Sequence, residues 1–385
     1  MRYYKIFFPV LVLLLLMIPL FHMNMSEITE QENRTLAKFP EIKKKNKLNE
    51  SYGKDFESWL GDHFWGRDQL IQARFKSLYK INGRIENERA FIGDDGWMFS
   101  KEIIPLHPTI HQRWWIKNSV EKLVKFADKF KGKNIPIYLV PIPDRSLIYK
   151  KYWERYYKKN WPTLDAVEEM EKMLENYPNI KIVPIKAELQ EIAKSELVFY
   201  KNDSHLTPLS ESIITKKIFS TLKKDYNLTN IQLKQLESTE KTEETAYLSA
   251  LLDLPAKHWV EQNNFIIIPE LNSTTLEEKI FKRISVLNSE EKLNAYTLRK
   301  TEKAPIQKKG YFLGPCYTAN SYNILYPLFS EAIKIYPMDN LDEEASSFIK
   351  NELQKLEKIE TDSSVIIIVI PPTYFYSGEG NKYFN

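Results

Sequence analysis

Two short stretches of the sequence combine residue types that can perform nucleophilic chemistry. The first runs from Tyr200 to Pro208 and places Asp203 two residues before His205. A carboxylate at this spacing can orient an imidazole and stabilise its cationic form, as the acid does in a nucleophile–His–acid triad. The stretch also resembles a helix start, with Thr207 as N-cap and Pro208 at the first helical position. Both interpretations can hold together, because such a cap would fix the loop that carries His205.

The second stretch is Gly314-Pro315-Cys316, which contains the only cysteine in the chain. Because Pro315 disfavours helical backbone at the residue before it, we expect Gly314 to be extended and Cys316 to lie at the start of the next helix. The partial positive charge of a helix N-terminus favours a thiolate, and its free N–H groups can bind an oxyanion. The alternative is a packing role, since free cysteine is among the most buried residue types.

Four further residues are candidates for binding a substrate. Tyr200 stands at the start of the Asp-x-His loop, and Asn320 follows Cys316 by about one helical turn. Asn320 is positioned to donate a hydrogen bond to an oxyanion or to a substrate. Trp114 and Trp115 offer flat apolar faces that suit pyranose rings, although the same pair is typical of the start of an amphipathic helix.

Composition narrows the classes of function. Basic and acidic residues number 55 and 51, which leaves a net charge of +4, and lysines alternate with glutamates along the chain, so we expect no nucleic-acid partner. His107 and His111 are four residues apart, as helical metal ligands can be, but Pro108 lies between them and no acidic partner is evident. We therefore expect neither a metal site nor a cofactor.

The N-terminus indicates export from the cytoplasm. Arg2 and Lys5 precede an uncharged run over 6–21, and the segment that follows is acidic. This pattern predicts a membrane helix whose basic end stays in the cytoplasm, with the main domain in the periplasm or at the cell surface. Because no small-x-small cleavage site follows the run, we favour an uncleaved signal anchor over a cleaved signal peptide.

Beyond residue 100 the pattern alternates between strands and helices. Apolar runs rich in Ile and Val, such as those at 135–143 and 364–372, suit strands that are buried on both faces of a parallel sheet. Both chemical stretches follow such strands, and the carboxyl ends of strands in an open α/β sheet are where ligands bind. Helices are expected at 117–131, 163–176, 186–194, from 208, at 318–332 and at 343–357.

These patterns divide the chain into five segments. Over 226–306 the pattern weakens, and only 263–269 resembles a firm strand. The predicted segments are a signal anchor at 1–24, a tether with a helix and a hairpin packing on the main domain at 25–100, the first half of the α/β domain at 101–225, an insertion at 226–306 and the second half of the domain at 307–385.

The order of several sequence blocks resembles a known family. The blocks are ENRTLAKFPEI, FESWLGDHFWGRDQLI, FIGDDGWMF, VPIPDRSLIY, FYKNDSHLTP and YFLGPCYTANSYNILYPLF. Together they resemble the SGNH-hydrolase-like polysaccharide O-acetyltransferases of the alginate type, the AlgX/AlgJ and DHHW group. The resemblance implies a three-layer, mostly parallel α/β domain that is circularly permuted, with the Asp-x-His pair upstream of the nucleophile.

The resemblance assigns the family's catalytic pair to Asp203 and His205, and its nucleophile to Cys316, where the family has serine. The family's tryptophan after the histidine is Leu206 here. The implied function is transfer of acetyl groups to a cell-envelope or secreted polysaccharide, with the groups supplied by a membrane-bound O-acyltransferase partner. Hydrolysis of acetyl esters is a close variant, in which water replaces the sugar hydroxyl. The alternative is an inactive family member that binds polysaccharide or acts as a scaffold for an export complex.

Overall fold

The structure, a computed structural model, describes most of the chain from residue 34 to residue 371. The described ranges are 28–29, 34–44, 47–82, 86–87, 89–101, 110–156, 164–236, 241–245, 257–261, 264–268, 273–284, 290–336 and 343–371, with the single positions Met23, Met25, Leu248, Leu252 and Leu271.

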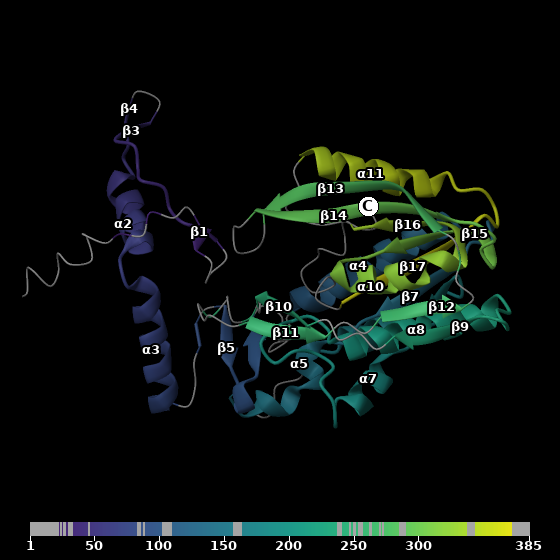
Figure 1. Ribbon diagram of the computed structural model, residues 1–385, viewed down its shortest axis with the longest axis horizontal. Helices are drawn as coiled ribbons and strands as arrows, with labels where there is room; N and C mark the ends of the chain where they lie inside the picture. Colours follow the sequence, from purple (N-terminus) through teal and green to yellow (C-terminus); the bar gives the residue numbers. More distant parts are fainter. Residues whose placement is uncertain are drawn as a thin grey trace, which may run out of the picture.

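A seven-stranded sheet forms the centre of the molecule (Figure 1). Its order is β13-β14-β16-β15-β17-β7-β8, and the five strands from β16 to β8 are parallel to one another. The bounds of its strands are β7 Ile137–Pro141, β8 Ile180–Ile182, β13 Ser273–Ile284, β14 Glu290–Thr301, β15 Ile306–Leu313, β16 Phe329–Ile335 and β17 Ser364–Ile370. All residues of β7 and β17 are buried, as their unbroken apolar sequences predicted.

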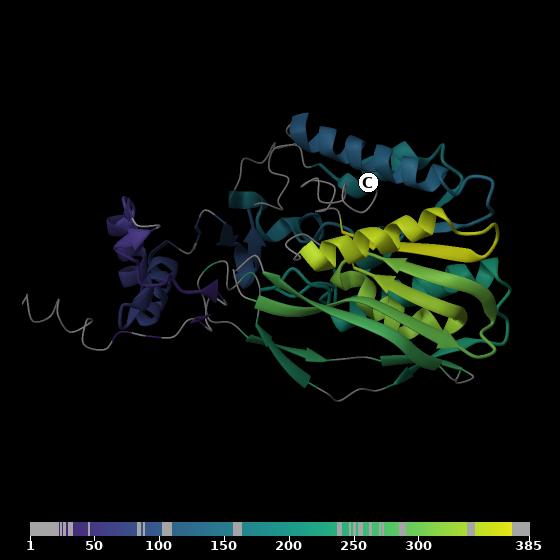
Figure 2. The same ribbon diagram turned by 90° about the horizontal axis from the view of Figure 1, so that it is seen from above.

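Helices cover both faces of this sheet and create two cores. Side chains of α4, α6 and α11 pack on one face, and those of α7, α8 and α10 pack on the other. Figure 2 shows α4 and α11 along the same side of the strands. The bounds of these helices are α4 Ile110–Asp128, α6 Ala166–Leu174, α7 Lys186–Ile192, α8 Pro208–Asp225, α10 Cys316–Leu325 and α11 Glu343–Glu357. The structure thus has the helix–sheet–helix layers that the sequence predicted.

The segment predicted as an insertion contributes to the main sheet, which the sequence did not predict. Strands β13 and β14 form a long antiparallel hairpin, and β14 pairs antiparallel with β16. The hairpin therefore extends the parallel sheet by two strands beyond β16. Two smaller antiparallel pairs precede it, namely β9 Gln232–Leu236 with β12 Asn264–Ile268, and β10 Lys241–Thr245 with β11 Lys257–Glu261.

The region before residue 101 contains short strands and two helices. α2 (Tyr52–His63) and α3 (Arg67–Asn82) are separated at Gly66, whose φ of +78° suits glycine. The predicted hairpin at 90–100 is present as β5 and β6. The short elements of this region are β1 Ile28–Thr29, β2 Arg34–Thr35, β3 Lys43–Lys44, β4 Lys47–Leu48, β5 Ala90–Ile92, η1 Asp94–Gly96 and β6 Met98–Ser100.

The signal anchor predicted for 1–24 lies outside the described residues apart from Met23. Among the helices that the structure describes, none is both long enough and apolar enough to cross a bilayer.

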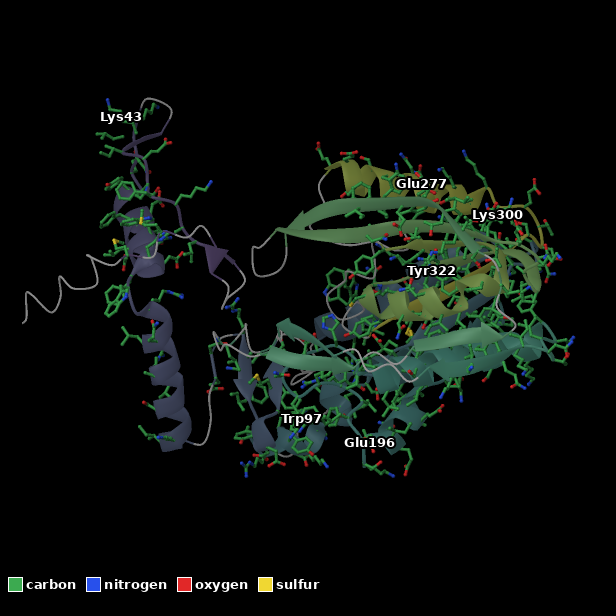
Figure 3. The ribbon with its side chains drawn as sticks, viewed as in Figure 1. Lys43, Trp97, Glu196, Glu277, Lys300 and Tyr322 are labelled. Carbon is green, nitrogen blue, oxygen red and sulfur yellow. The ribbon has the colours of Figure 1, made fainter. Side chains whose placement is uncertain are left out.

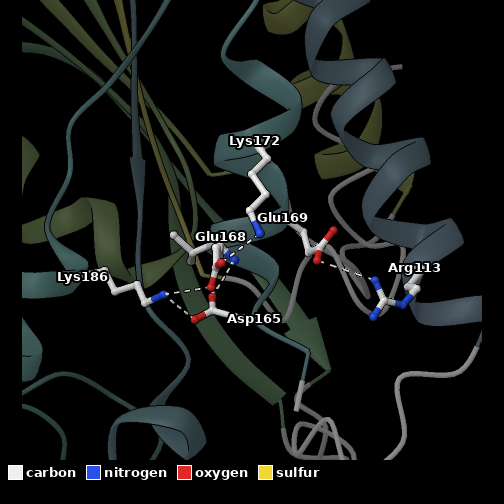
Figure 4. A network of polar contacts seen from close by, with 7 residues as sticks. Arg113, Asp165, Glu168, Glu169, Lys172 and Lys186 are labelled. Atoms are coloured by element: carbon white, nitrogen blue, oxygen red, sulfur yellow. Dashed lines mark hydrogen bonds and ion pairs between the residues drawn. The ribbon is translucent and has the colours of Figure 1, made fainter. Parts of the chain in front are cut away.

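Polar contacts tie α6 to its neighbours on the surface (Figure 4). Asp165 caps α6 by accepting hydrogen bonds from the backbone N–H groups of Val167 and Glu168. Lys186, at the start of α7, lies 2.5 Å from the Asp165 carboxylate, and Arg113 of α4 lies 3.6 Å from Glu169. Exposed ion pairs contribute little to stability, so the packing of the buried faces holds α6 in place.

Candidate functional site

The Asp-x-His loop joins α7 to α8 and is fixed at its end by a helix cap. The Thr207 hydroxyl accepts the backbone N–H of Ser210, and Pro208 is the first residue of α8. The same hydroxyl donates to the backbone carbonyl of Leu197, 2.6 Å away, on the other side of the loop. The predicted cap is therefore confirmed, and it closes the loop that carries His205.

Within this loop, Asp203 holds His205 through two hydrogen bonds. Its Oδ1 accepts from the backbone N–H of His205 at 2.8 Å and contacts the imidazole Nδ1 at 2.6 Å. Asp203 is 3% exposed, whereas the His205 side chain is 51% exposed. A buried carboxylate thus fixes an imidazole that solvent can reach, and the second ring nitrogen, Nε2, remains for another partner.

Cys316 lies where β15 gives way to α10. It is the first residue of α10, so it belongs to the first turn of the helix, two residues earlier than the predicted start. Gly314 adopts a φ of +151° rather than the extended backbone of an ordinary residue. A Cβ on Gly314 would lie 2.1 Å from both the Thr318 hydroxyl and the Val369 carbonyl oxygen, so only glycine lets the turn pack this closely.

The structure brings Cys316 and His205 together. The two side chains interact electrostatically, and Cys316 is partly exposed. Burial by the surrounding atoms lowers the pKa of His205, but a negatively charged Cys316 and the Asp203 carboxylate act more strongly and raise that pKa well above its usual range. This arrangement favours the imidazolium form of His205.

Arg145 holds the backbone of the loop just before Asp203. It belongs to α5 (Arg145–Ile148), a short helix after β7, and the residue is 8% exposed. Nε and Nη2 donate to the Tyr200 carbonyl at 3.1 and 2.7 Å, and Nη2 also donates to the Lys201 carbonyl at 2.8 Å. Nη1 donates to the carbonyl of Met98 in β6 at 2.7 Å. One buried cation therefore joins the loop to the β5–β6 hairpin.

The charge of Arg145 also acts on the site. Its guanidinium carbon lies 5.0 Å from the ring centroids of both Trp97 and Phe99, which form an apolar enclosure. Burial lowers the pKa of Arg145 to about 10, while the nearby Asp203 carboxylate acts in the opposite direction. Arg145 is therefore still cationic at neutral pH, and it lies within electrostatic range of Asp203.

Tyr317 holds the same loop from the other side. Its hydroxyl donates to the Ser204 carbonyl at 3.0 Å, and its ring centroid lies 6.0 Å from that of His205. Because Tyr317 directly follows Cys316, this bond sets the position of the His205 loop relative to the thiol. Neither Arg145 nor Tyr317 is among the residues predicted from the sequence. Two features of the sequence could have indicated them. Arg145 comes just after the apolar run at 135–143, and Tyr317 directly follows the only cysteine.

Asp144 caps the helix that carries Arg145. Its Oδ1 accepts hydrogen bonds from the backbone N–H and the hydroxyl of Ser146, both at 2.7 Å. The other oxygen, Oδ2, is buried and has no hydrogen-bond partner among the residues that the structure describes. Burial is the main cause that raises the pKa of Asp144 to about 6, and the bonds from Ser146 act against it.

The predicted substrate-binding residues are not gathered in one place. The Tyr200 carbonyl accepts from Arg145, so Tyr200 lies in the loop of the site. The Asn320 amide donates to Glu211 of α8 at 2.7 Å, a contact that joins α10 to α8. Trp114 and Trp115 form an edge-to-face pair near the start of α4, which packs on the sheet face opposite α10. A role in substrate binding stays a prediction for all four residues.

The residues that the structure describes include no candidate metal site. His107 lies outside them, and the described part of the chain holds no group of three His, Cys, Asp or Glu side chains that could hold an ion. What the site does offer is a thiol, an imidazole and a carboxylate in series beside the start of a helix. Such a series can perform acyl transfer through a covalent intermediate.

Three solved structures have similar folds. The O-acetyltransferase domain of Pseudomonas putida AlgJ is 14% identical, with 75% of this chain and 92% of that one covered and a TM-score of 0.49. Bacillus cereus PatB1 is 9% identical, with coverages of 75% and 97% and a TM-score of 0.48. A DHHW family protein from Eubacterium siraeum is 15% identical, with coverages of 77% and 96% and a TM-score of 0.45.

None of the curated proteins matches the sequence. Residues 90–267 match the family model described as an SGNH hydrolase-like domain of the acetyltransferase AlgX. The matched range begins at β5 and includes the Asp203–His205 loop. This match confirms the resemblance that the sequence blocks indicated, to SGNH hydrolase-like acetyltransferases of the AlgX type.

Proposed function

We propose that this protein transfers acetyl groups to a polysaccharide of the cell envelope or to a secreted polysaccharide, with Cys316 as the nucleophile. The observation that carries the proposal is the series Cys316–His205–Asp203, in which a hydrogen bond joins His205 to Asp203 and an electrostatic interaction joins His205 to Cys316. The series stands at the carboxyl end of β15, where ligands bind in open α/β sheets. Because Asp203 and His205 precede Cys316 in the chain, we also infer that the domain is circularly permuted.

In the first half-reaction, the Cys316 thiolate attacks the carbonyl carbon of a donor acetyl ester. The S–C bond forms, the ester C–O bond breaks, and the His205 imidazolium gives its proton to the leaving oxygen. In the second half-reaction, neutral His205 takes the proton of a sugar hydroxyl, whose oxygen attacks the thioester and releases the thiolate. General acid–base catalysis of this kind increases the reaction rate roughly 10²–10⁴-fold.

The backbone of α10 is suited to stabilise the oxyanion of each tetrahedral intermediate. Pro315 is the N-cap of α10 and supplies no side-chain cap. The first-turn N–H groups of a helix lack partners within the helix, and the helix dipole favours negative charge there. A preorganised hydrogen-bond donor to the oxyanion increases the reaction rate roughly 10²–10³-fold. We assign this role to the backbone N–H of Cys316.

The acetyl donor and the location of the protein belong to the same proposal. The uncharged run at 6–21 would anchor the chain in the membrane, with the α/β domain outside the cytoplasm. A membrane-bound O-acyltransferase would then deliver acetyl groups to the outer side for Cys316 to accept. Protease digestion of intact cells tests the orientation: degradation of the domain without cell lysis is expected, and full protection would contradict it.

The decisive experiment measures hydrolysis of an acetyl ester by the full chain and by variants of the series. We expect Cys316→Ala and His205→Ala each to lower the rate about 10²-fold or more. Intact-protein mass spectrometry should show one added acetyl group on the wild type and none on Cys316→Ala. Since Cys316 is the only cysteine, a thioester has a single possible position.

His63→Gln is the matched control, because His63 lies in α2, outside residues 90–267 that match the family model and outside the Cys316–His205–Asp203 series. It should leave the rate unchanged. Cys316→Ser tests whether the site accepts the family's usual nucleophile, and we expect partial activity. If wild type and Cys316→Ala are equally inactive while the protein binds polysaccharide, the catalytic proposal is wrong and the protein is a binding member of the family.

A further inference from the structure

Two cationic side chains lie close together on the sheet face that α10 covers. Arg299 belongs to β14 and Lys334 to β16, and these strands pair antiparallel with Thr297 opposite Lys334 and Arg299 opposite Ala332. Arg299 and Lys334 are thus diagonal neighbours on one face, with Cα atoms expected about 7–8 Å apart. Figure 3 shows the hairpin that carries Arg299 next to Tyr322 of α10.

Aromatic rings, rather than carboxylates, surround these cations. The Lys334 Nζ lies 5.9 Å from the ring centroid of Tyr322. The Arg299 guanidinium carbon lies 5.6 Å from the same centroid and 4.4 Å from that of Tyr326. The Tyr322 hydroxyl donates to the Thr297 carbonyl at 3.2 Å, and it accepts no hydrogen bond from Arg299 or Lys334 in the described structure. Contacts with ring faces attract a cation but do not neutralise its charge.

Neither cation has an anionic partner among the residues that the structure describes. Lys334 is 8% exposed and makes no hydrogen bond or ion pair with them, and the Arg299 Nε is buried without an acceptor. The carboxylate that acts on the charge of Lys334 is that of Glu278 in β13. It accepts a hydrogen bond from the Asn294 amide at 3.3 Å and none from Lys334. Burial and the charge of Arg299 lower the pKa of Lys334, and Glu278 only partly opposes them.

Burying a cation without a counter-charge is costly, and a second cation beside it adds repulsion. An anion between the two side chains removes both costs. Arginine presents a planar fork that matches the oxygens of a carboxylate or phosphate, and lysine adds a compact positive charge. We propose that Arg299 and Lys334 form a binding site for one oxyanion, a carboxylate or a phosphate. This site is separate from the proposed acetyl transfer and does not depend on it.

Isothermal titration calorimetry with the full chain at low ionic strength tests the site. The probes are inorganic phosphate and glucuronate, with glucose as the uncharged control. Wild type should bind at least one of the two anions and not glucose. Lys334→Met and Arg299→Gln should each weaken that binding about tenfold or more, since a hydrogen bond to a charged group contributes about 1.5–3 kcal/mol.

Lys300→Met is the matched control, because Lys300 is the next residue on β14, is exposed and points to the other face of the sheet (Figure 3). It should bind the anions like the wild type. Stronger binding of glucuronate would identify a sugar carboxylate as the ligand, and binding of phosphate alone would identify a phosphate group. The proposal fails if the wild type binds neither anion, or if Lys334→Met binds them as well as Lys300→Met does.

Thermal unfolding gives a second measurement that also shows whether the variants fold. Without anions, Lys334→Met should unfold at the same temperature as the wild type or higher, because it removes an uncompensated buried charge. The bound anion should raise the unfolding temperature of the wild type but not that of Lys334→Met. Equal stabilisation of both proteins would overturn the proposal. No acetyl donor enters either measurement, so failure of the anion site and failure of acetyl transfer are distinguishable.

Discussion

At the scale of single residues, the charge state of His205 decides what the site can do. Asp203 and Cys316 both favour the imidazolium, and their effect exceeds that of burial. A histidine whose pKa is raised serves well as the acid that protonates a leaving group, and it becomes the base after it gives up that proton. The same interactions make the protein's stability depend on pH.

Asp203→Asn should lower the pKa of His205 toward its ordinary value of about 6.5. It should also lower the esterase rate about 10²–10⁴-fold, because the imidazole loses its orienting carboxylate. Because the folded-state pKa is raised, the stability that Asp203 provides is fully present below about pH 6.5 and is lost as the pH rises through the folded value. The NMR titration of the His205 ring checks the pKa, and an unchanged titration would contradict its cause.

Asp144→Asn should stabilise the protein at neutral pH. An asparagine keeps the Oδ1 acceptor that caps α5, but it carries no charge to bury. Since the folded-state pKa of Asp144 is about 6, the stability that its protonated form provides is complete below the unfolded pKa of 3.8 and falls as the pH rises through 6. The variant should therefore gain about 1–3 kcal/mol over the wild type at pH 7.5 and much less at pH 4.5. Urea unfolding at both pH values measures the difference, and an equal effect at the two values would rule out ionisation as its cause.

At the scale of elements, the site depends on how the loop between α7 and α8 is held. Apart from the bridge between Phe199 and Leu206, this loop has no strand pairing, and side chains together with a backbone bond from Met98 to the Lys201 carbonyl fix it. Arg145 binds its first part from α5, and Tyr317 binds its middle from α10. Both elements follow strands of the central sheet. The position of His205 relative to Cys316 is therefore set by the sheet and not by the loop itself.

We predict that Arg145 is a positioning residue and that Arg145→Lys and Arg145→Met differ in a diagnostic way. Lys keeps the positive charge near Asp203 but cannot form the same set of bonds to Met98, Tyr200 and Lys201. It should lower kcat about 10–100-fold with little change in KM, and the pH profile should keep its shape. Met removes the charge as well, so its pH profile should also shift.

The control for these variants is Arg113→Lys, an exposed arginine of α4 that pairs only with Glu169 in the described structure. It should match the wild type in kcat and in its pH profile. If Arg145→Lys and Arg145→Met have the same kcat and the same pH profile, the charge of Arg145 has no role beyond folding.

The sequence predicted the parts of this arrangement that depend on local pattern. Asp203 and His205 are two residues apart, and the Thr207–Pro208 cap is a local motif, so both could be recognised without a structure. Arg145 could not, because arginine is usually exposed and its burial depends on carbonyls more than 45 residues away along the chain. The pairing of β14 with β16 could not be predicted for a similar reason. Its charged sequence shows no clear alternation, and the register comes from the neighbouring strand.

At the scale of the whole molecule, β17 connects the two halves of the site. It lies between β15, which leads to Cys316, and β7, which leads to Arg145. Its side chains alternate between the two cores, with Ile367 in the core beneath α8 and α10. A change in this strand therefore affects stability and the spacing of the catalytic groups together, whereas a change on the edge strand β13 affects neither.

We predict different effects for the same substitution in the central strand β17, Ile367→Ala, and in the edge strand β13, Ile280→Ala. Ile367 is fully buried, so its loss should cost about 2–5 kcal/mol in the free energy of unfolding through lost burial and the remaining cavity. Ile280 of β13 is 59% exposed, and its loss should change stability by about 0.5 kcal/mol or less. Urea unfolding measures both, and the esterase rate under folding conditions shows whether the cavity in β17 also disturbs the site. Because Cys316 and Arg145 begin the helices that follow the strands flanking β17, we expect Ile367→Ala to lower that rate even where the protein is folded. Equal rates for the two variants would show that α10 and the His205 loop keep their geometry without close packing beneath them.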